Sequence, residues 1–312
     1  MLNGILLLDK PAGFTSHDAV AKLRGILHQK KIGHAGTLDP MATGVLVILL
    51  GNATRASDHA SGQSKEYHAR LRLGLTTDTQ DIAGKVLSRS PAAVPSEQLA
   101  LALAAFTGKI DQLPPMYSAV QVGGRRLYDL ARKGLEIERQ SREISIEEMC
   151  LLPSPDLPEG DYDLKVICSK GTYIRTLCHD IGQFLGCGGC MAALRRVRSG
   201  QFSLDRAMTL EQISDSFREG TLEDRIFPTE SVFSDLPAVF LNEEGDLRAS
   251  HGAFFAPSHL VRGTFPEEGG CCRVYDSSGR FCQIAQAGKL DRGDAALFCK
   301  INFAALGRKE EG

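Results

Sequence analysis

Apolar residues recur every three or four positions in four segments of the chain, which predicts four amphipathic helices. The first begins with Ser16 as its expected N-terminal cap, and the second runs from about residue 96 to Gly108. The third begins near residue 172 and ends at Gly186, because glycine permits the left-handed backbone that commonly ends helices. The fourth begins at Thr209 and Gln212, whose spacing is typical of a capping box.

Strands are expected where apolar and polar residues alternate, or where apolar residues form a short continuous run. Residues 67–73 alternate between an apolar side and a basic outer side that carries Arg70 and Arg72. Residues 162–168 also alternate, and residues 44–51 form a continuous apolar run typical of a buried strand. Helices and strands do not alternate regularly, so the pattern favours an α+β fold with a mixed, largely antiparallel central sheet flanked by helices.

The pattern changes after about residue 236, where short strands alternate with glycine-rich turns as far as Phe303. A chain of 312 residues has room for two modules of unequal size. We therefore expect a larger domain at residues 1–235, a small β-rich domain at residues 236–306, and a tail at residues 307–312.

Composition is that of an ordinary globular protein, with 43% hydrophobic and 24% charged residues. The apolar run at the N-terminus is too short for a signal sequence or a membrane span, so we expect a cytoplasmic protein with no membrane contact. Nine cysteines without an export signal indicate free thiols rather than disulfides. Cys187 and Cys190 form a CxxC pair, which leaves a zinc site as an alternative, although zinc usually takes a second pair of ligands.

The net charge of -2 does not indicate a nucleic-acid-binding protein, but local charge is more informative than the average. Each basic cluster is a candidate for phosphate contacts and is also consistent with an ordinary solvated surface. Three such clusters occur: Lys30 and Lys31 with His34; Arg125, Arg126, Arg132 and Lys133; and Arg195, Arg196 and Arg198.

Residues 33–46, GHAGTLDPMATGVL, form the most unusual segment of the chain. Three glycines and a proline surround a single carboxylate, Asp39, directly before an apolar strand. Glycines at such a place permit close approach of a ligand or a left-handed backbone. Asp39 followed by Pro40 is also typical of a turn in which the aspartate bonds to its own backbone, so the residues alone leave both interpretations open.

Five segments of the chain, in order, resemble the TruB family of tRNA pseudouridine synthases over nearly its whole length. The resemblance implies the pseudouridine synthase fold with a small C-terminal PUA-like domain. It also implies that uridine 55 of tRNA is isomerised, with no metal, nucleotide or redox cofactor. The segments are residues 6–20 (LLLDKPAGFTSHDAV), 33–46, 65–84 (KEYHARLRLGLTTDTQDIAG), 114–134 (PPMYSAVQVGGRRLYDLARKG) and 169–177 (SKGTYIRTL).

The resemblance assigns three catalytic residues. Asp39 is expected to be the nucleophile, Arg175 to pair with it, and Tyr67 to stack on the flipped uracil and assist deprotonation. The sequence leaves open attack at C1′ of the ribose, attack at C6 of the base, and a glycal route in which a proton first leaves C2′. By position alone, Arg175 would be a surface residue near a helix start, where its charge opposes the helix dipole.

Three further residues match the family's uracil pocket. Tyr173 corresponds to a second pocket tyrosine, and Leu194 to an apolar residue that contacts the base. His34 corresponds to a histidine that helps to displace the base and occupies the space it leaves, which does not require a charged ring. Without the resemblance, all three would be interpreted as ordinary core or loop residues.

The resemblance implies tRNA as the partner and no obligate protein partner. We expect contacts with the T-loop and T-stem, and contacts with the acceptor stem through the C-terminal domain. Two other classes remain as alternatives: an RNA-binding or RNA-folding protein with secondary activity, and a cysteine-dependent metalloenzyme. The residues expected to contact phosphate are Arg125, Arg126, Arg195, Arg196 and Arg198.

Overall fold

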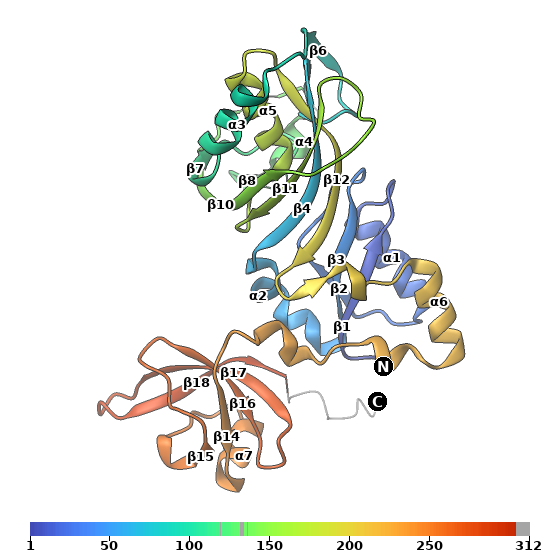
Figure 1. Ribbon diagram of the computed structural model, residues 1–312. Coiled ribbons are helices and arrows are strands. Elements are labelled where there is room, and N and C mark those ends of the chain that lie inside the picture. Colours follow the sequence, from blue (N-terminus) through green and yellow to red (C-terminus); the bar gives the residue numbers. More distant parts are fainter. Residues whose placement is uncertain (119, 132–133, 136, 304–312) are drawn as a thin grey trace.

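The computed structural model describes residues 1–118, 120–131, 134–135 and 137–303 (Figure 1). The expected tail at residues 307–312 lies outside these residues. The helices are α1 Ser16–Ile26, α2 Ser57–Gly62, α3 Ser96–Ala105, α4 Leu127–Ala131, α5 Ile174–Phe184, α6 Leu210–Glu219 and α7 Glu243–Ser250, with 3₁₀ turns η1 Gly51–Ala56, η2 Leu204–Arg206, η3 Leu222–Arg225, η4 Thr229–Phe233 and η5 Pro257–His259. The strands are β1 Gly4–Lys10, β2 Ile32–Ala35, β3 Thr43–Leu50, β4 Lys65–Leu73, β5 Leu75–Thr77, β6 Val86–Arg89, β7 Gly108–Gln112, β8 Gln121–Val122, β9 Arg125–Arg126, β10 Arg142–Leu151, β11 Asp161–Cys168, β12 Gly189–Ser199, β13 Phe202–Ser203, β14 Ala238–Leu241, β15 Leu260–Arg262, β16 Cys271–Tyr275, β17 Phe281–Lys289 and β18 Ala295–Asn302.

The central sheet has the strand order β1-β3-β12-β4-β11-β10-β7, with β2 paired to β3 and β13 paired to β12. The neighbouring strands run antiparallel except β12 and β3, which run parallel. Helices α3 and α5 lie beside the β4, β11 and β10 half, while α1 and α6 lie beside β1–β3 (Figure 1). The expectation of an α+β fold with a mixed, largely antiparallel sheet is therefore confirmed.

Strand β12 joins the two halves of the sheet, because it lies between β3 and β4. Its parallel pairing with β3 is short, with Thr43 opposite Arg195 and Gly44 opposite Arg196. Gly44 has a left-handed φ of +98°, and a Cβ there would lie only 2.1 Å from the carbonyl oxygen of Arg196. Glycine is thus required where these two backbones meet.

The predicted helices form, with one correction at the first. Helix α6 begins with the expected capping box and ends at a left-handed Gly220. The N-cap of α1 is Thr15 rather than Ser16, because Thr15 and Asp18 bond reciprocally to each other's backbone N–H groups. Ser16 is buried and bonds instead to the backbone of Leu38, at the loop that precedes β3.

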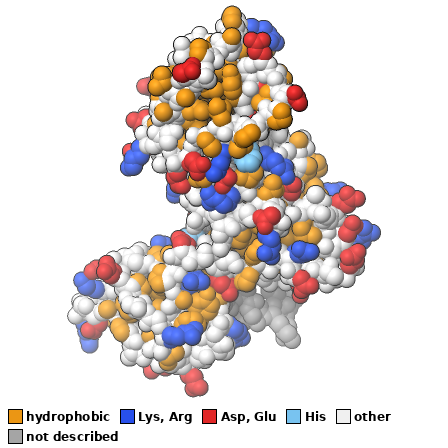
Figure 2. Space-filling view, viewed as in Figure 1, with side chains coloured by type: hydrophobic (Ala, Val, Ile, Leu, Met, Phe, Trp, Pro, Cys, Tyr) orange, Lys and Arg blue, Asp and Glu red, His pale blue; other side chains and the backbone are white. Residues whose placement is uncertain are grey.

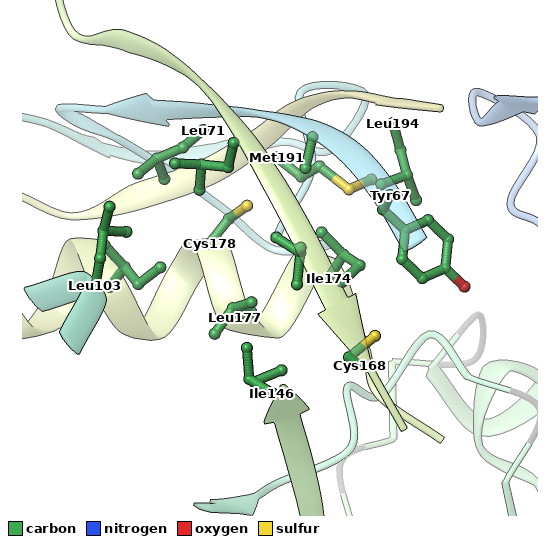
Figure 3. Close-up of a cluster of buried hydrophobic side chains, with 14 of the residues drawn as sticks. Tyr67, Leu71, Leu103, Ile146, Cys168, Ile174, Leu177, Cys178, Met191 and Leu194 are labelled. Carbon is green, nitrogen blue, oxygen red and sulfur yellow. The ribbon is translucent and has the colours of Figure 1, made fainter. Parts of the chain in front are cut away.

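The apolar side of β4, β11 and β12 packs against α3 and α5 to form the core of one half of the sheet. Figure 3 shows part of this core, including Leu71, Leu177 and Met191. A separate cluster, with Leu8 and Leu23 at its centre, packs α1 and α6 against β1 and β3. The two halves therefore have their own cores and meet along β12.

The C-terminal sheet has the order β15-β14-β16-β17-β18. Strands β14, β15 and β16 are short, as the sequence pattern predicts, whereas β17 and β18 have 9 and 8 residues. It has its own core, to which Val239, Phe255 and Leu297 belong. Phe281 and Phe303 pack around the ring of Phe233 from η4, which fastens this sheet to the rest of the protein. In the described ranges, no helix is long and apolar enough to cross a membrane.

Candidate active site

The loop between β2 and β3 carries Asp39 and is held by the segment from the end of β1 to the start of α1. The hydroxyl of Ser16 accepts a hydrogen bond from the N–H of Leu38 at 2.9 Å and donates to its carbonyl at 3.2 Å. Lys10 is fully buried, and its Nζ donates to the carbonyl of Pro40 at 3.4 Å and to two carbonyls of its own loop at 2.7 and 2.8 Å. Both residues that flank Asp39 are therefore fixed to the same segment.

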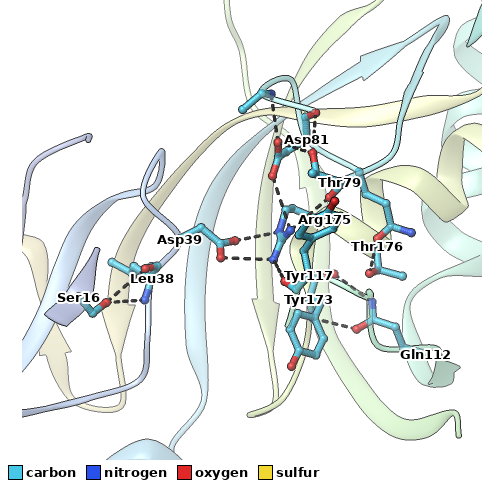
Figure 4. Close-up of polar contacts among 12 residues, drawn as sticks. Ser16, Leu38, Asp39, Thr79, Asp81, Gln112, Tyr117, Tyr173, Arg175 and Thr176 are labelled. Atoms are coloured by element: carbon cyan, nitrogen blue, oxygen red, sulfur yellow. Dashed lines mark hydrogen bonds and ion pairs between the residues drawn. The ribbon is translucent and has the colours of Figure 1, made fainter. Parts of the chain in front are cut away.

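Arg175, in the first turn of α5, holds the carboxylate of Asp39 (Figure 4). Its Nε lies 2.9 Å from one carboxylate oxygen, and its Nη2 donates to the other at 3.3 Å. The Asp39 side chain is 36% exposed, whereas that of Arg175 is 6% exposed. The interpretation of Arg175 as a surface residue is wrong, because the helix start faces the active site rather than solvent.

The remaining donors of Arg175 are also occupied. Nη1 donates to the carbonyl of Thr79 at 3.2 Å, and Nη2 donates to the carbonyl of Tyr117 at 2.9 Å. Nη1 also lies 3.6 Å from the buried carboxylate of Asp81. Sequence reasoning did not single out Asp81, because nothing in its local spacing indicates a partner almost a hundred positions away. One guanidinium therefore lies between two carboxylates.

The surroundings of Asp39 change its pKa in two directions. Burial raises the pKa of this carboxyl above its usual value, the charge of Arg175 acts to lower it, and the charge of Asp81 adds to the rise. The direct contact with Arg175 stabilises the ionised form, while partial burial removes part of the stabilisation by water. Such a perturbed carboxylate beside a buried cation is typical of a catalytic group.

Tyr67 and Leu194 come from neighbouring strands, β4 and β12, and both are buried at one end of the central core. Figure 3 shows the hydroxyl of Tyr67 pointing away from that core. Burial raises the pKa of Tyr67, while the charge of Arg196 and a hydrogen bond from its guanidinium act to lower it. The phenol is therefore protonated in the free protein, beside a cation that would stabilise a phenolate.

Tyr173 directly precedes α5 and is fixed through its backbone. Its N–H donates to Oε1 of Gln112 at 2.8 Å, and its carbonyl accepts from Nε2 of Gln112 at 3.1 Å. Burial raises the pKa of the Tyr173 phenol. Sequence reasoning missed Gln112, which stands at the end of β7 just before the family-like segment at 114–134.

His34 lies in β2, which the sequence pattern did not predict, and its ring stands edge-on to His17 with 5.3 Å between centroids. Burial, together with the charges of His17 and Arg196, lowers the pKa of His34 to about 4. The ring is therefore neutral near neutral pH, in agreement with a role that does not need its charge.

The expected phosphate contact by Arg196 is wrong, because this side chain is buried. Arg196 is 1% exposed. Its Nε donates to the carbonyl of Val45 at 2.7 Å and its Nη2 to the carbonyl of Gly36 at 2.8 Å. Its guanidinium thus holds the two ends of the loop that carries Asp39, instead of facing RNA.

The other expected phosphate contacts are paired with carboxylates or are not described. Arg195 lies 2.7 Å from Asp9, and Arg198 lies 3.3 Å from Glu66; both arginines are partly exposed. The side chains of Arg125 and Arg126 and the residues Arg132 and Lys133 lie outside the described part of the chain.

The basic outer side expected for β4 is neutralised by β11. Arg70 bonds to both oxygens of Asp163 at 2.8 and 2.9 Å, and Arg72 bonds to both oxygens of Asp161 at 2.7 and 2.6 Å. Positive and negative side chains are accordingly interspersed on the face that Figure 2 shows. This strand does not form a positive track, since the neighbouring strand supplies a carboxylate to each arginine.

All nine cysteines have free thiols. Burial raises the pKa of Cys190 to about 11, so this thiol keeps its proton in the metal-free protein. Among the described residues, no three His, Cys, Asp or Glu side chains gather as a metal site would require. The geometry gives the zinc alternative at Cys187 and Cys190 no support.

Two family models match the sequence. The N-terminal domain of TruB family pseudouridylate synthases matches residues 24–174, and the C-terminal domain of tRNA pseudouridylate synthase B matches residues 175–234. The tRNA pseudouridine synthase B of Bacillus pumilus is 42% identical over 289 residues, which cover 88% of this chain and 93% of that protein. That of Stutzerimonas stutzeri is 43% identical over 289 residues, covering 91% of this chain and 92% of that protein.

Solved structures of related proteins share the fold. A protein in a Cbf5-Nop10-Gar1 complex superposes with a TM-score of 0.75 at 28% identity, covering 97% of this chain and 85% of that one. Another, from an H/ACA RNP bound to a substrate RNA containing 2′-deoxyuridine, has a TM-score of 0.73 at 26% identity, covering 96% of this chain and 84% of that one. Sequence and fold agree that the chain belongs to the TruB family of pseudouridylate synthases, isomerases that act on tRNA.

Proposed function

We propose that the chain converts uridine 55, in the T-loop of tRNA, to pseudouridine, with Asp39 as the nucleophile and no cofactor. The N1–C1′ bond of the uridine breaks, the uracil turns, a C5–C1′ bond forms, C5 loses its proton and N1 gains one. The covalent bond that Asp39 forms with the substrate is broken again before the product leaves. The observation that carries this proposal is the carboxylate of Asp39, which is aligned by the buried guanidinium of Arg175 at 2.9 Å.

In this proposal, Arg175 positions the nucleophile and keeps it ionised. Its planar group contacts both oxygens of Asp39, which fixes the orientation of the carboxylate as well as its charge. The carbonyls of Thr79 and Tyr117 hold the guanidinium from the other side. Preorganised charge of this kind does not have to reorient during the reaction.

The flipped uracil would lie against the aromatic and apolar side chains next to Asp39. We propose that Tyr67 stacks on the base and assists loss of the C5 proton, with Arg196 stabilising a phenolate. Tyr173 and Leu194 would complete the pocket. The neutral ring of His34 would occupy the space that the base leaves in the RNA stack.

The wider RNA contacts follow from the same proposal. Residues 1–235 would form the catalytic domain, and residues 236–306 a PUA-like domain that contacts the acceptor stem. Arg195 and Arg198, both partly exposed, would contact phosphates of the T-loop and T-stem. We place this activity in the cytoplasm, without a membrane or an obligate protein partner.

The test is to incubate unmodified tRNA with the purified full chain, without added cofactor, and to map pseudouridine by position. The wild-type chain should modify position 55, and a tRNA with cytidine at that position should remain unmodified. Asp39→Asn should abolish the product while retaining tRNA binding. The matched control is Asp58→Asn, since Asp58 is an exposed aspartate in α2. Product at another position, or modification by Asp39→Asn, would contradict the proposal.

A further inference from the structure

Gln112 is a buried amide whose two polar atoms both bond to the backbone of one residue. The side chain is 2% exposed, and it pairs with the N–H and the carbonyl of Tyr173 as a neighbouring strand would (Figure 4). Sixty-one positions separate the two residues. The amide therefore fixes both the position and the direction of the backbone just before α5.

Contacts from distant residues hold the start of α5, and they include, besides the Gln112 pair, a hydrogen bond from Oγ1 of Thr176 to Oε1 of Gln80 at 2.8 Å. Tyr173 occupies the N-cap position with no capping side chain, although caps normally satisfy the free N–H groups of a first turn. The first turn also carries the cation of Arg175, which is unfavourable at the positive end of the helix dipole. This helix start must therefore be held by contacts from elsewhere in the fold.

Gln112 also anchors the segment that holds the guanidinium of Arg175. Five residues after Gln112, the carbonyl of Tyr117 accepts a hydrogen bond from Nη2 of Arg175 at 2.9 Å. Pro114 and Pro115 lie between them and restrict the backbone. Hydrogen bonds and backbone therefore close a ring. Gln112 is bonded to Tyr173, the backbone continues from Tyr173 to Arg175, and Arg175 is bonded to Tyr117, which the backbone connects back to Gln112.

We propose that Gln112 is a positioning residue for the isomerisation: its amide sets the place of the first turn of α5, and thereby aligns Arg175 with Asp39. This inference rests on the proposed roles of Asp39 and Arg175. Gln112 does not itself contact Asp39. Its loss would displace the guanidinium while leaving the RNA-binding surface in place.

The chain offers a matched control in Gln29. This residue is also buried, at 7% exposure, and its amide pairs in the same way with the N–H and carbonyl of Leu2, at 2.8 and 3.0 Å. Gln112→Leu and Gln29→Leu should therefore lower the thermal midpoint by similar amounts. A loss of turnover confined to Gln112→Leu would separate positioning from simple destabilisation.

For Gln112→Leu we expect kcat to fall about 10-fold or more, because small displacements of a catalytic pair have large effects on rate. The Kd for unmodified tRNA should stay within about 3-fold of wild type, since no phosphate-contacting group is changed. Gln29→Leu should keep kcat within about 2-fold. Equal kcat values for the two variants would overturn the inference.

Gln112→Glu provides a second measurement that does not depend on the leucine variant folding. A protonated glutamic acid can donate to the carbonyl of Tyr173 and accept from its N–H, whereas an ionised one cannot donate. The ratio of its kcat to that of wild type should therefore fall as pH rises. Two results would contradict the inference: a ratio that stays near one at every pH, or a ratio that stays at the value of the leucine variant at every pH. In either case the paired hydrogen bonds would not position Arg175.

Asp39→Asn distinguishes failure of this inference from failure of the proposed function. If Asp39→Asn were active, Asp39 would not be the nucleophile, and both the proposed function and the role of Gln112 would fail. An inactive Asp39→Asn protein together with a fully active Gln112→Leu protein would contradict only the positioning role of Gln112.

Discussion

Arg175 contacts both carboxylate oxygens of Asp39, although 136 positions separate the two residues in the sequence. The same guanidinium lies 3.6 Å from the carboxylate of Asp81. A single buried cation therefore compensates two carboxylates that would otherwise repel each other. The geometry and the charge of this group have separate consequences that substitutions can distinguish.

Replacing Arg175 tests the two contributions in turn. Arg175→Lys keeps the charge but loses the two-point contact, so kcat should fall about 10- to 100-fold. Arg175→Ala also leaves Asp39 and Asp81 without their cation, and kcat should fall about 1000-fold or more. Single-turnover rates and equilibrium tRNA binding would be measured for both. A defect in binding alone, with unchanged rates at saturating protein, would contradict the positioning of Asp39 by Arg175.

Asp81→Asn should change the pH dependence of turnover in a defined direction. The charge of Asp81 raises the pKa of Asp39, so its removal should lower that pKa. Because the proposed nucleophile is the ionised form of Asp39, the acidic limb of the kcat profile should move to lower pH. The maximum rate should also fall, since Asp81 helps to hold Arg175. An acidic limb that moved to higher pH would show that Asp81 does not act on Asp39 through its charge.

His34 should make the folded protein less stable in acid. Its pKa is lowered from 6.5 to about 4 in the folded protein, so the unfolded chain takes up this proton first as pH falls. The stabilisation from neutral His34 is present above pH 6.5 and is lost as pH falls toward about 4. His34→Gln should therefore lose less unfolding free energy between neutral and acidic pH than wild type, measured by urea titration. Equal losses of unfolding free energy in wild type and His34→Gln would contradict this prediction.

Gln283 is a buried amide in β17 that has no hydrogen-bond partner for either polar atom within the described residues. Leaving such groups unpaired costs about 1–3 kcal/mol each. Gln283→Met keeps the shape and removes both polar atoms, so it should raise the unfolding free energy by about 1–2 kcal/mol. Gln286→Met is the control, because Gln286 donates to the carbonyl of Gly269 at 2.8 Å. A destabilised Gln283→Met protein would mean that the amide is satisfied in solution.

The salt dependence of tRNA binding should distinguish arginines that contact RNA from arginines that pair with carboxylates within the sheet. Each phosphate contact contributes about 0.7–0.9 to the slope of log K against log salt. Arg195→Ala should reduce the slope for tRNA binding by about that amount. Arg70→Ala should leave the slope unchanged, because Arg70 is bonded at two points to Asp163. Equal slopes for wild type and Arg195→Ala would remove Arg195 from the RNA interface.

Local patterns predicted the elements that depend on local contacts. The capping box and the terminal Gly220 of α6 lie within the helix they delimit, so the sequence alone identifies both ends. The alternation in residues 67–73 similarly identified β4. At α1 the expected cap, Ser16, binds the backbone of Leu38 instead, and its neighbour Thr15 caps the helix. The contact with Leu38 is long-range, so the helix pattern does not contain it.

The active site depends on contacts between distant parts of the chain, and there local patterns were insufficient. Arg195 and Arg196 look alike in sequence, yet only Arg196 is buried, because its side chain points toward the Asp39 loop. The family resemblance identified Arg175, but Asp81 and Gln112 emerged only from the folded arrangement. The topology of the sheet determines which residues they contact, and the residues next to them in the sequence do not.

The late position of β12 in the chain has a consequence for the order of folding. Asp39 belongs to the half of the sheet that ends at β3, whereas Tyr67 and Arg175 belong to the half that contains β4 and α5. These halves are joined by β12, which follows both in the sequence. Contacts of such long range form slowly, because a long loop must close first. A nascent chain whose β12 has not yet emerged from the ribosome should hold Asp39 and Arg175 in two separate parts of the structure. Enzymatic activity would then report completion of the sheet.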